Sequence, residues 1–259
     1  MGGLLRFVVV VMAVSGLLAC ASSPPPDTRP WSVQTAERLE RTLGPDRVAL
    51  APRQAVEDLE RALQLYSLAD DQEGQARCHI KLARLYLRSD DEAQAGSHLA
   101  NARRIAGRLG RRPLQFESAL LTGRLSNRRE DFEQALGYAG SPIEQAVALT
   151  YLGRLEQAYQ LVRPHLATAD TAPDDFAFVL HRYAVSSRDM ATARQSLELY
   201  KQTDNHLGAA SALYLMGQIA TENRNPGQAR GYLERALVVS RALSDRSHVQ
   251  RVEAALEGL

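Results

Sequence analysis

Four basic side chains recur at helical spacing in the first half of the chain: Arg77, Lys81, Arg84 and Arg88. Steps of four, three and four residues place them on one face of an α-helix. Aligned guanidinium and ammonium groups could bind the carboxylates of a peptide. The alternative is a solvated face that is neutralised by acidic residues of the preceding helix, such as Glu57 and Glu60.

We call these four side chains the basic stripe. No residue pattern typical of an enzyme accompanies it. The six histidines form neither a His-Glu-x-x-His pair nor another known zinc spacing. The sequence also lacks a Gly-rich phosphate loop and a Gly-x-Ser-x-Gly elbow. Acidic pairs such as Asp174-Asp175 fall at expected helix starts, where the helix dipole favours them. We therefore expect no catalytic activity, no metal site and no cofactor.

The elements that must position these side chains are helices. Apolar residues recur at helical spacing between short polar breaks, and no long stretch alternates with period two. Three helix starts have a capping-box pattern, with Glu or Gln three residues after the cap. The expected caps are Ser89, Ser141 and Asn225. The sequence therefore predicts an all-α fold.

Two segments, residues 82–102 and 216–236, carry small and apolar residues at identical spacings of 12, 4 and 3. The matched pairs are Ala83 and Gly217, Ala95 and Ala229, Leu99 and Leu233, and Ala102 and Ala236. Both segments resemble tetratricopeptide repeats, in which small residues let two antiparallel helices pack closely. Tyr86 matches the tyrosine of that family, whereas Ala220 replaces it in the second copy.

Weaker copies of the repeat can be aligned on alanines, which we call the phasing alanines. Each is followed four residues later by an apolar residue. The phasing alanines are Ala55, Ala95, Ala135, Ala158, Ala193 and Ala229, with separations of 40, 40, 23, 35 and 36. The gap of 23 predicts short helices and a distortion around residues 130–160. The resemblance implies a right-handed superhelical solenoid of helix-turn-helix repeats over residues 31–259, which begins with a leading helix at 31–44. The alternative is an unrelated helical bundle.

In the resembled family, the first helix of each hairpin lines a groove that holds peptide segments. The equivalent positions are Arg77, Lys81, Arg84 and Arg88 in one copy, and Phe178, Arg182, Tyr214 and Gln218 in two others. Exposed aromatic side chains beside arginine are typical of interfaces. Phe178 could instead be buried against the next repeat.

A second basic cluster follows the stripe. Its first group is Arg103, Arg104, Arg108, Arg111 and Arg112, and its second is Arg124, Arg128 and Arg129. The cluster could face anionic lipid or glycan. For the first group we favour a local explanation, since a helix C-terminus attracts cations. For the second group both explanations stay open.

The chain begins with an apolar run of twelve residues, Phe7 to Leu18, after the single charge of Arg6. This run is too short to span a membrane and is typical of an export signal. The sequence Leu17, Leu18, Ala19, Cys20 resembles a bacterial lipobox. The resemblance implies cleavage before Cys20, a diacylglyceryl thioether on its sulfur and acylation of its amino group. The alternative is a plain secretory signal, cut after Ala19 or Ala21.

Residues 20–30 are small, polar or proline, which predicts an extended tether after a cleaved signal at 1–19. Ala21 rather than Asp follows Cys20, which by resemblance to envelope sorting rules favours the outer membrane, facing the periplasm, over the inner membrane.

The net charge and the cysteine content expected after cleavage exclude further functions. Cleavage would remove Arg6, so Lys+Arg falls from 31 to 30 against 30 Asp+Glu. A net charge of zero argues against a general nucleic-acid binder. With Cys20 lipidated, Cys78 could form no intrachain disulfide, and we expect it to be a buried apolar residue.

We expect a lipid-anchored periplasmic adaptor that binds an envelope protein or peptide segment, with no nucleic acid and no small-molecule substrate. By resemblance, lipoproteins of this build serve outer-membrane protein assembly, pilus assembly or peptidoglycan enzymes. The alternatives are a peptidoglycan- or glycan-binding module, a self-associating structural protein, and an enzyme with an unrecognised site.

Overall fold

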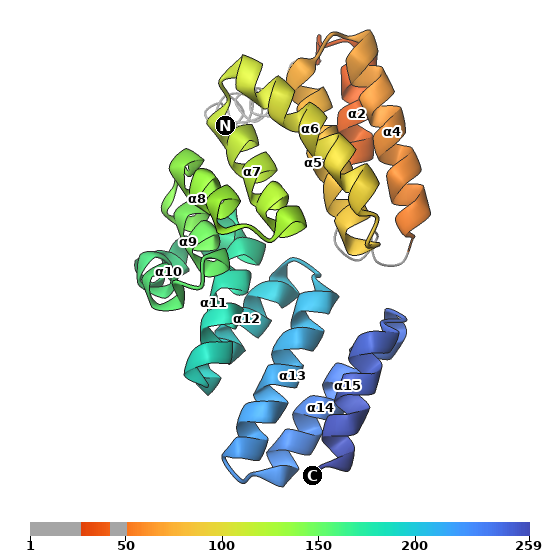
Figure 1. Cartoon of the computed structure of the whole chain (residues 1–259). Coiled ribbons are helices and arrows are strands. Elements are labelled where there is room, and N and C mark those ends of the chain that lie inside the picture. The colour runs from red at the N-terminus through yellow and green to blue at the C-terminus, as the bar shows by residue number, and fades with distance from the viewer. Residues whose placement is uncertain (1–26, 42–50) are drawn as a thin grey trace, which may run out of the picture. The chain divides into compact units, whose positions relative to one another are not determined.

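The computed structural model describes residues 27–41 and 51–259 (Figure 1). The signal segment, Cys20 and the first part of the tether lie outside the described residues. All regular secondary structure in the described ranges is helical, which confirms the predicted all-α class. The helices are α2 (Trp31–Arg41), α4 (Pro52–Leu68), α5 (Gln72–Arg88), α6 (Glu92–Leu109), α7 (Arg112–Ser126), α8 (Arg129–Tyr138), α9 (Pro142–Tyr151), α10 (Leu155–Val162), the 3-10 helix η1 (Arg163–Thr171), α11 (Pro173–Ser187), α12 (Met190–Gln202), α13 (His206–Glu222), α14 (Pro226–Ala242) and α15 (Arg246–Glu257).

Residues 32–259 form one compact unit in which each helix packs mainly against its neighbours in sequence. The largest contacts join α5 to α6, α13 to α14, α11 to α12 and α7 to α8. Buried apolar side chains form clusters that follow one another along the chain, from the cluster around Tyr66 to the one around Met216. Such consecutive packing is compatible with a solenoid of helical repeats.

Small residues set how closely the helices approach. All six phasing alanines are fully buried. Cys78 is also fully buried, and this burial raises the pKa of its thiol to about 12, so the thiol stays protonated. The expected apolar role of Cys78 is therefore confirmed. The short helices predicted near residues 130–160 are also present, since α8 and α9 have 10 residues and α10 has 8.

The helix starts were predicted correctly in two of three cases. Ser141 and Glu144 form a reciprocal capping box, and the Asn225 side chain accepts a hydrogen bond from the Gln228 backbone N–H at 3.1 Å. The assignment of Ser89 as a cap was wrong. Asp91 caps α6, while the Ser89 hydroxyl donates back to the Tyr86 carbonyl at 3.2 Å.

Several turns share one conformation, a left-handed residue followed by the capping residue. The left-handed residue has φ between 51° and 57° at Asp70, Asp90, Asp204, Arg224 and Ser244. The next residue in each case caps the following helix through its side chain. A residue other than glycine or asparagine rarely adopts this conformation without cost.

Two tyrosine–glycine contacts are alike in distant parts of the chain. A Cβ atom added to Gly74 would overlap the ring of Tyr66, and one added to Gly208 would overlap the ring of Tyr200. In both turns the backbone carbonyl of the tyrosine accepts a hydrogen bond of 2.9 Å, from Asp71 and Asn205 respectively. Glycine is therefore needed at both positions, because only its missing side chain leaves room for the ring.

Candidate functional site

The basic stripe lies on α5, and its first half is neutralised by a buried carboxylate. Glu40 of α2 has only 6% of its side chain exposed. Lys81 Nζ lies 3.0 Å from Glu40 Oε1, and an Arg77 terminal nitrogen lies 3.5 Å from Glu40 Oε2. The Tyr66 hydroxyl donates a hydrogen bond of 2.6 Å to the same carboxylate. Burial and the bond to Glu40 raise the pKa of Tyr66, so its hydroxyl stays protonated and keeps donating to Glu40 at neutral pH.

Arg84 is paired as well, but at the surface. Its guanidinium lies 3.3 Å from the carboxylate of Glu117 on α7, and both side chains are about half exposed. The acids that balance the stripe therefore come from α2, from α7 and, through Glu73 at 4.0 Å from Arg77, from α5 itself. The expected acids of α4, Glu57 and Glu60, make no ion pair with it in the described part of the chain.

Arg88 differs from the other three cations. It has no ion pair within the described residues. Burial, reinforced by the nearby charge of Arg124, lowers the pKa of Arg88. The charge of Asp245 opposes this shift, and Arg88 is exposed, so its guanidinium is accessible to an anion.

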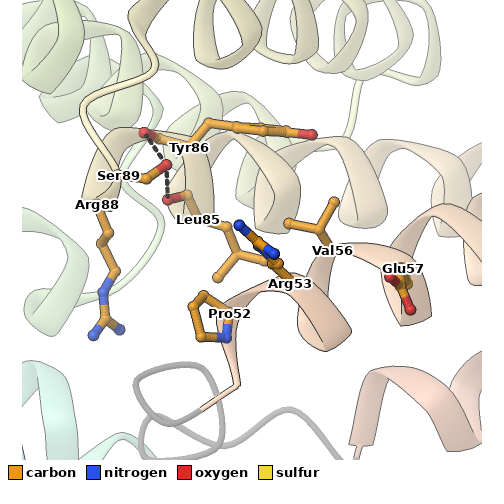
Figure 2. Close-up of a pocket in the computed structure, with 8 residues that line it drawn as sticks. All are labelled: Pro52, Arg53, Val56, Glu57, Leu85, Tyr86, Arg88 and Ser89. Atoms are coloured by element: carbon orange, nitrogen blue, oxygen red, sulfur yellow. Dashed lines mark hydrogen bonds between the residues drawn. The ribbon is translucent and has the colours of Figure 1, made fainter. Parts of the chain in front are cut away.

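Arg88 borders a cavity of about 620 Å³ between the start of α4 and the end of α5, which we call the α4–α5 pocket. Figure 2 shows Pro52, Val56 and Leu85 gathered between the two helices, with Arg88 at one end. Arg53 and Glu57 also line the pocket, together with Tyr86 and Ser89. Like Arg88, Arg53 has no ion pair among the described residues. An apolar floor with two such guanidinium groups suits a segment that combines an apolar side chain with a carboxylate.

The candidates on the C-terminal helices occupy mixed environments. Phe178 is partly buried and stacks on Tyr151 with ring centroids 5.2 Å apart, so it packs into the core. Tyr214 meets the ring of His248 edge-on at 5.5 Å. Arg182 is exposed and Gln218 is half-buried, and no hydrogen bond or ion pair joins either to the stripe within the described residues. Within the described residues, no hydrogen bond, ion pair or ring contact joins these four side chains to one another.

The sequence placed Asp175 at a helix start but did not predict the electrostatic environment of its carboxylate. Asp175 on α11 is exposed, and partial loss of solvation still raises the pKa of its carboxyl to about 6. The charge of Arg84 opposes this shift, and those of Glu117 and Glu144 add to it. No sequence pattern predicts this neighbourhood, because its members come from four separate helices.

No protein-family model matches this sequence, and no curated protein matches it. Within the described residues, no group of three or more potential metal ligands occurs. None of the described helices is both long and apolar enough to span a membrane.

Proposed function

We propose that this protein is a lipid-anchored adaptor at the outer membrane, facing the periplasm, which binds a segment of another envelope protein in the α4–α5 pocket. Cys20 carries the lipid, residues 20–30 form the tether, and residues 31–259 form a right-handed superhelix of tetratricopeptide-like hairpins. The protein acts without catalysis or cofactor, by bringing a partner to the membrane.

The repeat architecture is supported by the equivalent contacts in α4–α5 and α12–α13. Tyrosine and glycine have the same spacing, the same turn and the same ring contact in both places. The alanines that phase the copies are buried throughout. Stacked hairpins with this packing present a row of helix faces to a partner.

The anchor is supported by the sequence Leu17, Leu18, Ala19, Cys20 and by the proline tether that follows. Two or more acyl chains make membrane attachment long-lived, whereas one chain is marginal. Replacing Cys20 with Ser should move the protein from the membrane fraction to the soluble periplasm. If the Cys20→Ser protein stayed in the membrane fraction, the lipid anchor would be refuted.

The observation that carries partner binding is the α4–α5 pocket, with Arg53 and Arg88 beside an apolar floor. The test is crosslinking of the full chain in its native envelope, followed by identification of the crosslinked proteins. The double variant Arg53→Glu, Arg88→Glu should lose the specific partner. The matched control is Arg230→Glu, Arg235→Glu, which changes two exposed arginines of α14 by the same charge.

Two results would contradict the proposal. If the native protein yields no specific crosslink, the adaptor function is wrong. If both double variants retain the partner equally, the protein is an adaptor but the α4–α5 pocket is not its binding site.

A further inference from the structure

A second cavity lies among α6, α7 and α8, with a volume of about 320 Å³. It shares no lining residue with the α4–α5 pocket. Apart from Ala119, the side chains that line it are polar, and they come from all three helices: Arg103, Arg104, Gln115, Ser118, Gln134 and Tyr138. No carboxylate is among the described residues that line it. We call it the α6–α8 cavity.

The two guanidinium groups of this cavity form hydrogen bonds with neutral partners, and the charge of Arg103 also helps to lower the pKa of nearby Asp131. Arg103 donates to the side-chain oxygen of Gln134 at 3.2 Å, and Arg104 donates to that of Asn101 at 3.4 Å. Neither makes an ion pair with another described residue. Nearby Arg128, by contrast, lies 3.2 Å from the carboxylate of Asp131. Two adjacent cations in one cavity therefore keep their capacity to bind an oxoanion bidentately.

The preference of cations for a helix C-terminus does not account for this pair. Of the arginines on α6, only Arg108 lies in the last turn. Arg103 and Arg104 come before it, so their position is not explained by the helix dipole, which acts mainly within the last turn. The helix-end explanation favoured from the sequence is therefore wrong for these two residues.

The other lining groups suit hydroxyl groups. Carboxamides donate and accept, so Gln115 and Gln134 can each bind a hydroxyl. Ser118 is buried and donates its own proton to the Gln115 carbonyl at 3.2 Å, which leaves its oxygen as an acceptor. The Tyr138 hydroxyl can either donate or accept a hydrogen bond. Such a mixture of amides and hydroxyls beside cations matches a small ligand that carries several hydroxyls and one negative charge.

We propose that the α6–α8 cavity binds an anionic sugar of monosaccharide size, such as a sugar acid or a sugar phosphate. Arg103 and Arg104 hold the oxoanion, and Gln115, Gln134 and Tyr138 bind the sugar hydroxyls. The volume is at the small end of the range for ligand pockets, roughly 300–1,000 Å³, which suits one ring. This site is independent of the protein-binding function proposed above.

The cavity can be closed without disturbing the core. Gly107 lines it from the last turn of α6, and a Cβ added there meets no atom within 4 Å. Methionine also has a higher helix propensity than glycine. Gly107→Met should therefore fill the cavity while α6 stays intact. Gly231→Met is the matched control, because Gly231 is an exposed helical glycine of α14 with equally open surroundings.

The test is isothermal titration of the purified full chain with four probes: glucuronate, glucose 6-phosphate, glucose and inorganic phosphate. We expect at least one of the two anionic sugars to bind at least tenfold more tightly than glucose and than inorganic phosphate. Gly107→Met and the double variant Arg103→Gln, Arg104→Gln should each weaken that binding at least tenfold, whereas Gly231→Met leaves it unchanged.

Each contrary result overturns a stated part of the proposal. Absence of binding by both anionic sugars up to about 10 mM overturns the site. Equal binding of glucose overturns the role of the two arginines, and equal binding of inorganic phosphate overturns recognition of the sugar. If circular dichroism shows that Gly107→Met does not fold, the titration of the Arg103→Gln, Arg104→Gln variant tests the site in its place. Loss of partner capture in the envelope would leave these titrations unaffected, so the two proposals fail separately.

Discussion

The α4–α5 and α12–α13 pairs place a tyrosine against a glycine in the same way, but surround the tyrosine differently. Tyr66 donates its hydroxyl to the buried carboxylate of Glu40, which also meets Arg77 and Lys81. The Tyr200 ring meets His181 edge-on, and its hydroxyl donates to no described residue. On α13, moreover, most of the side chains between Ala209 and Ala220 are buried.

The comparison shows that the two helix pairs share a packing contact but differ in the side chains that surround it. The contact between the tyrosine ring and the glycine sets the distance between the two helices. Both pairs need this distance, so the contact is the same in both. The face beyond the ring is polar and charged on α5 but largely apolar on α13. The charged side chains of α5 pair with Glu40, whereas the buried side chains of α13 pack in an apolar cluster with the neighbouring helices.

The largest expected effect comes from the shared contact itself. Gly74→Leu and Gly208→Leu each force a side chain into a tyrosine ring, which should lower the free energy of unfolding by about 3 kcal/mol or more. Gly231→Leu, at an open position, should change it by less than about 0.5 kcal/mol. Urea denaturation measures all three. Equal stability of the three variants would show that the ring contacts are not important.

The second effect should distinguish the two tyrosines. Tyr66→Phe removes a hydrogen bond to a buried carboxylate and should cost about 1.5–3 kcal/mol. Tyr200→Phe removes a hydroxyl that donates to no described residue and should cost less than about 0.5 kcal/mol. The same denaturation assay applies. Similar losses for both variants would contradict the difference drawn between the two pairs.

A smaller effect should depend on pH. The pKa of Asp175 is about 6 in the folded protein against 3.8 for an unperturbed aspartate, so ionisation disfavours the fold. This penalty is absent below pH 3.8, grows as pH rises and is complete above about pH 6. Asp175→Asn should therefore raise the melting temperature at pH 7.5 and leave it nearly unchanged at pH 3.5. A gain that is equal at both pH values would contradict this cause.

The smallest effect concerns the exposed end of the stripe. Arg84 and Glu117 form an ion pair that is about half exposed, so Arg84→Ala should cost less than about 1 kcal/mol. Added salt should reduce the difference between the native and variant proteins, since exposed pairs are screened. Denaturation at low and high salt measures this. A loss as large as that of Tyr66→Phe would mean that Arg84 has a further buried partner.

Local rules predicted most of the scaffold. Periodicity gave the all-α class, the alanine spacings identified buried positions, and the caps at Ser141 and Asn225 follow from a few neighbouring residues. The cap at Ser89 failed because Asp90 adopts the left-handed conformation and shifts the helix start to Asp91. Several residue types in this turn can cap a helix, and the sequence pattern does not choose among them.

The candidate site was less predictable, since it depends on how separate helices dock. The spacing of the stripe placed its cations on one face, but nothing local indicated that Glu40 would be buried against Arg77 and Lys81. The pocket likewise joins Arg53 at the start of α4 to Arg88 at the end of α5. Phe178 turned inward because Tyr151 offers it an aromatic surface.

The left-handed turn residues have a practical consequence for engineering. Arg224 and Ser244 hold a positive φ without the freedom of glycine, and neither lines the α4–α5 pocket or the α6–α8 cavity. Glycine at these positions would relieve about 1 kcal/mol of backbone strain each, less the entropy that it adds to the unfolded chain. Substitution by glycine would change only turns outside the α4–α5 pocket and the α6–α8 cavity, with a net gain in stability of at most about 1 kcal/mol at each position.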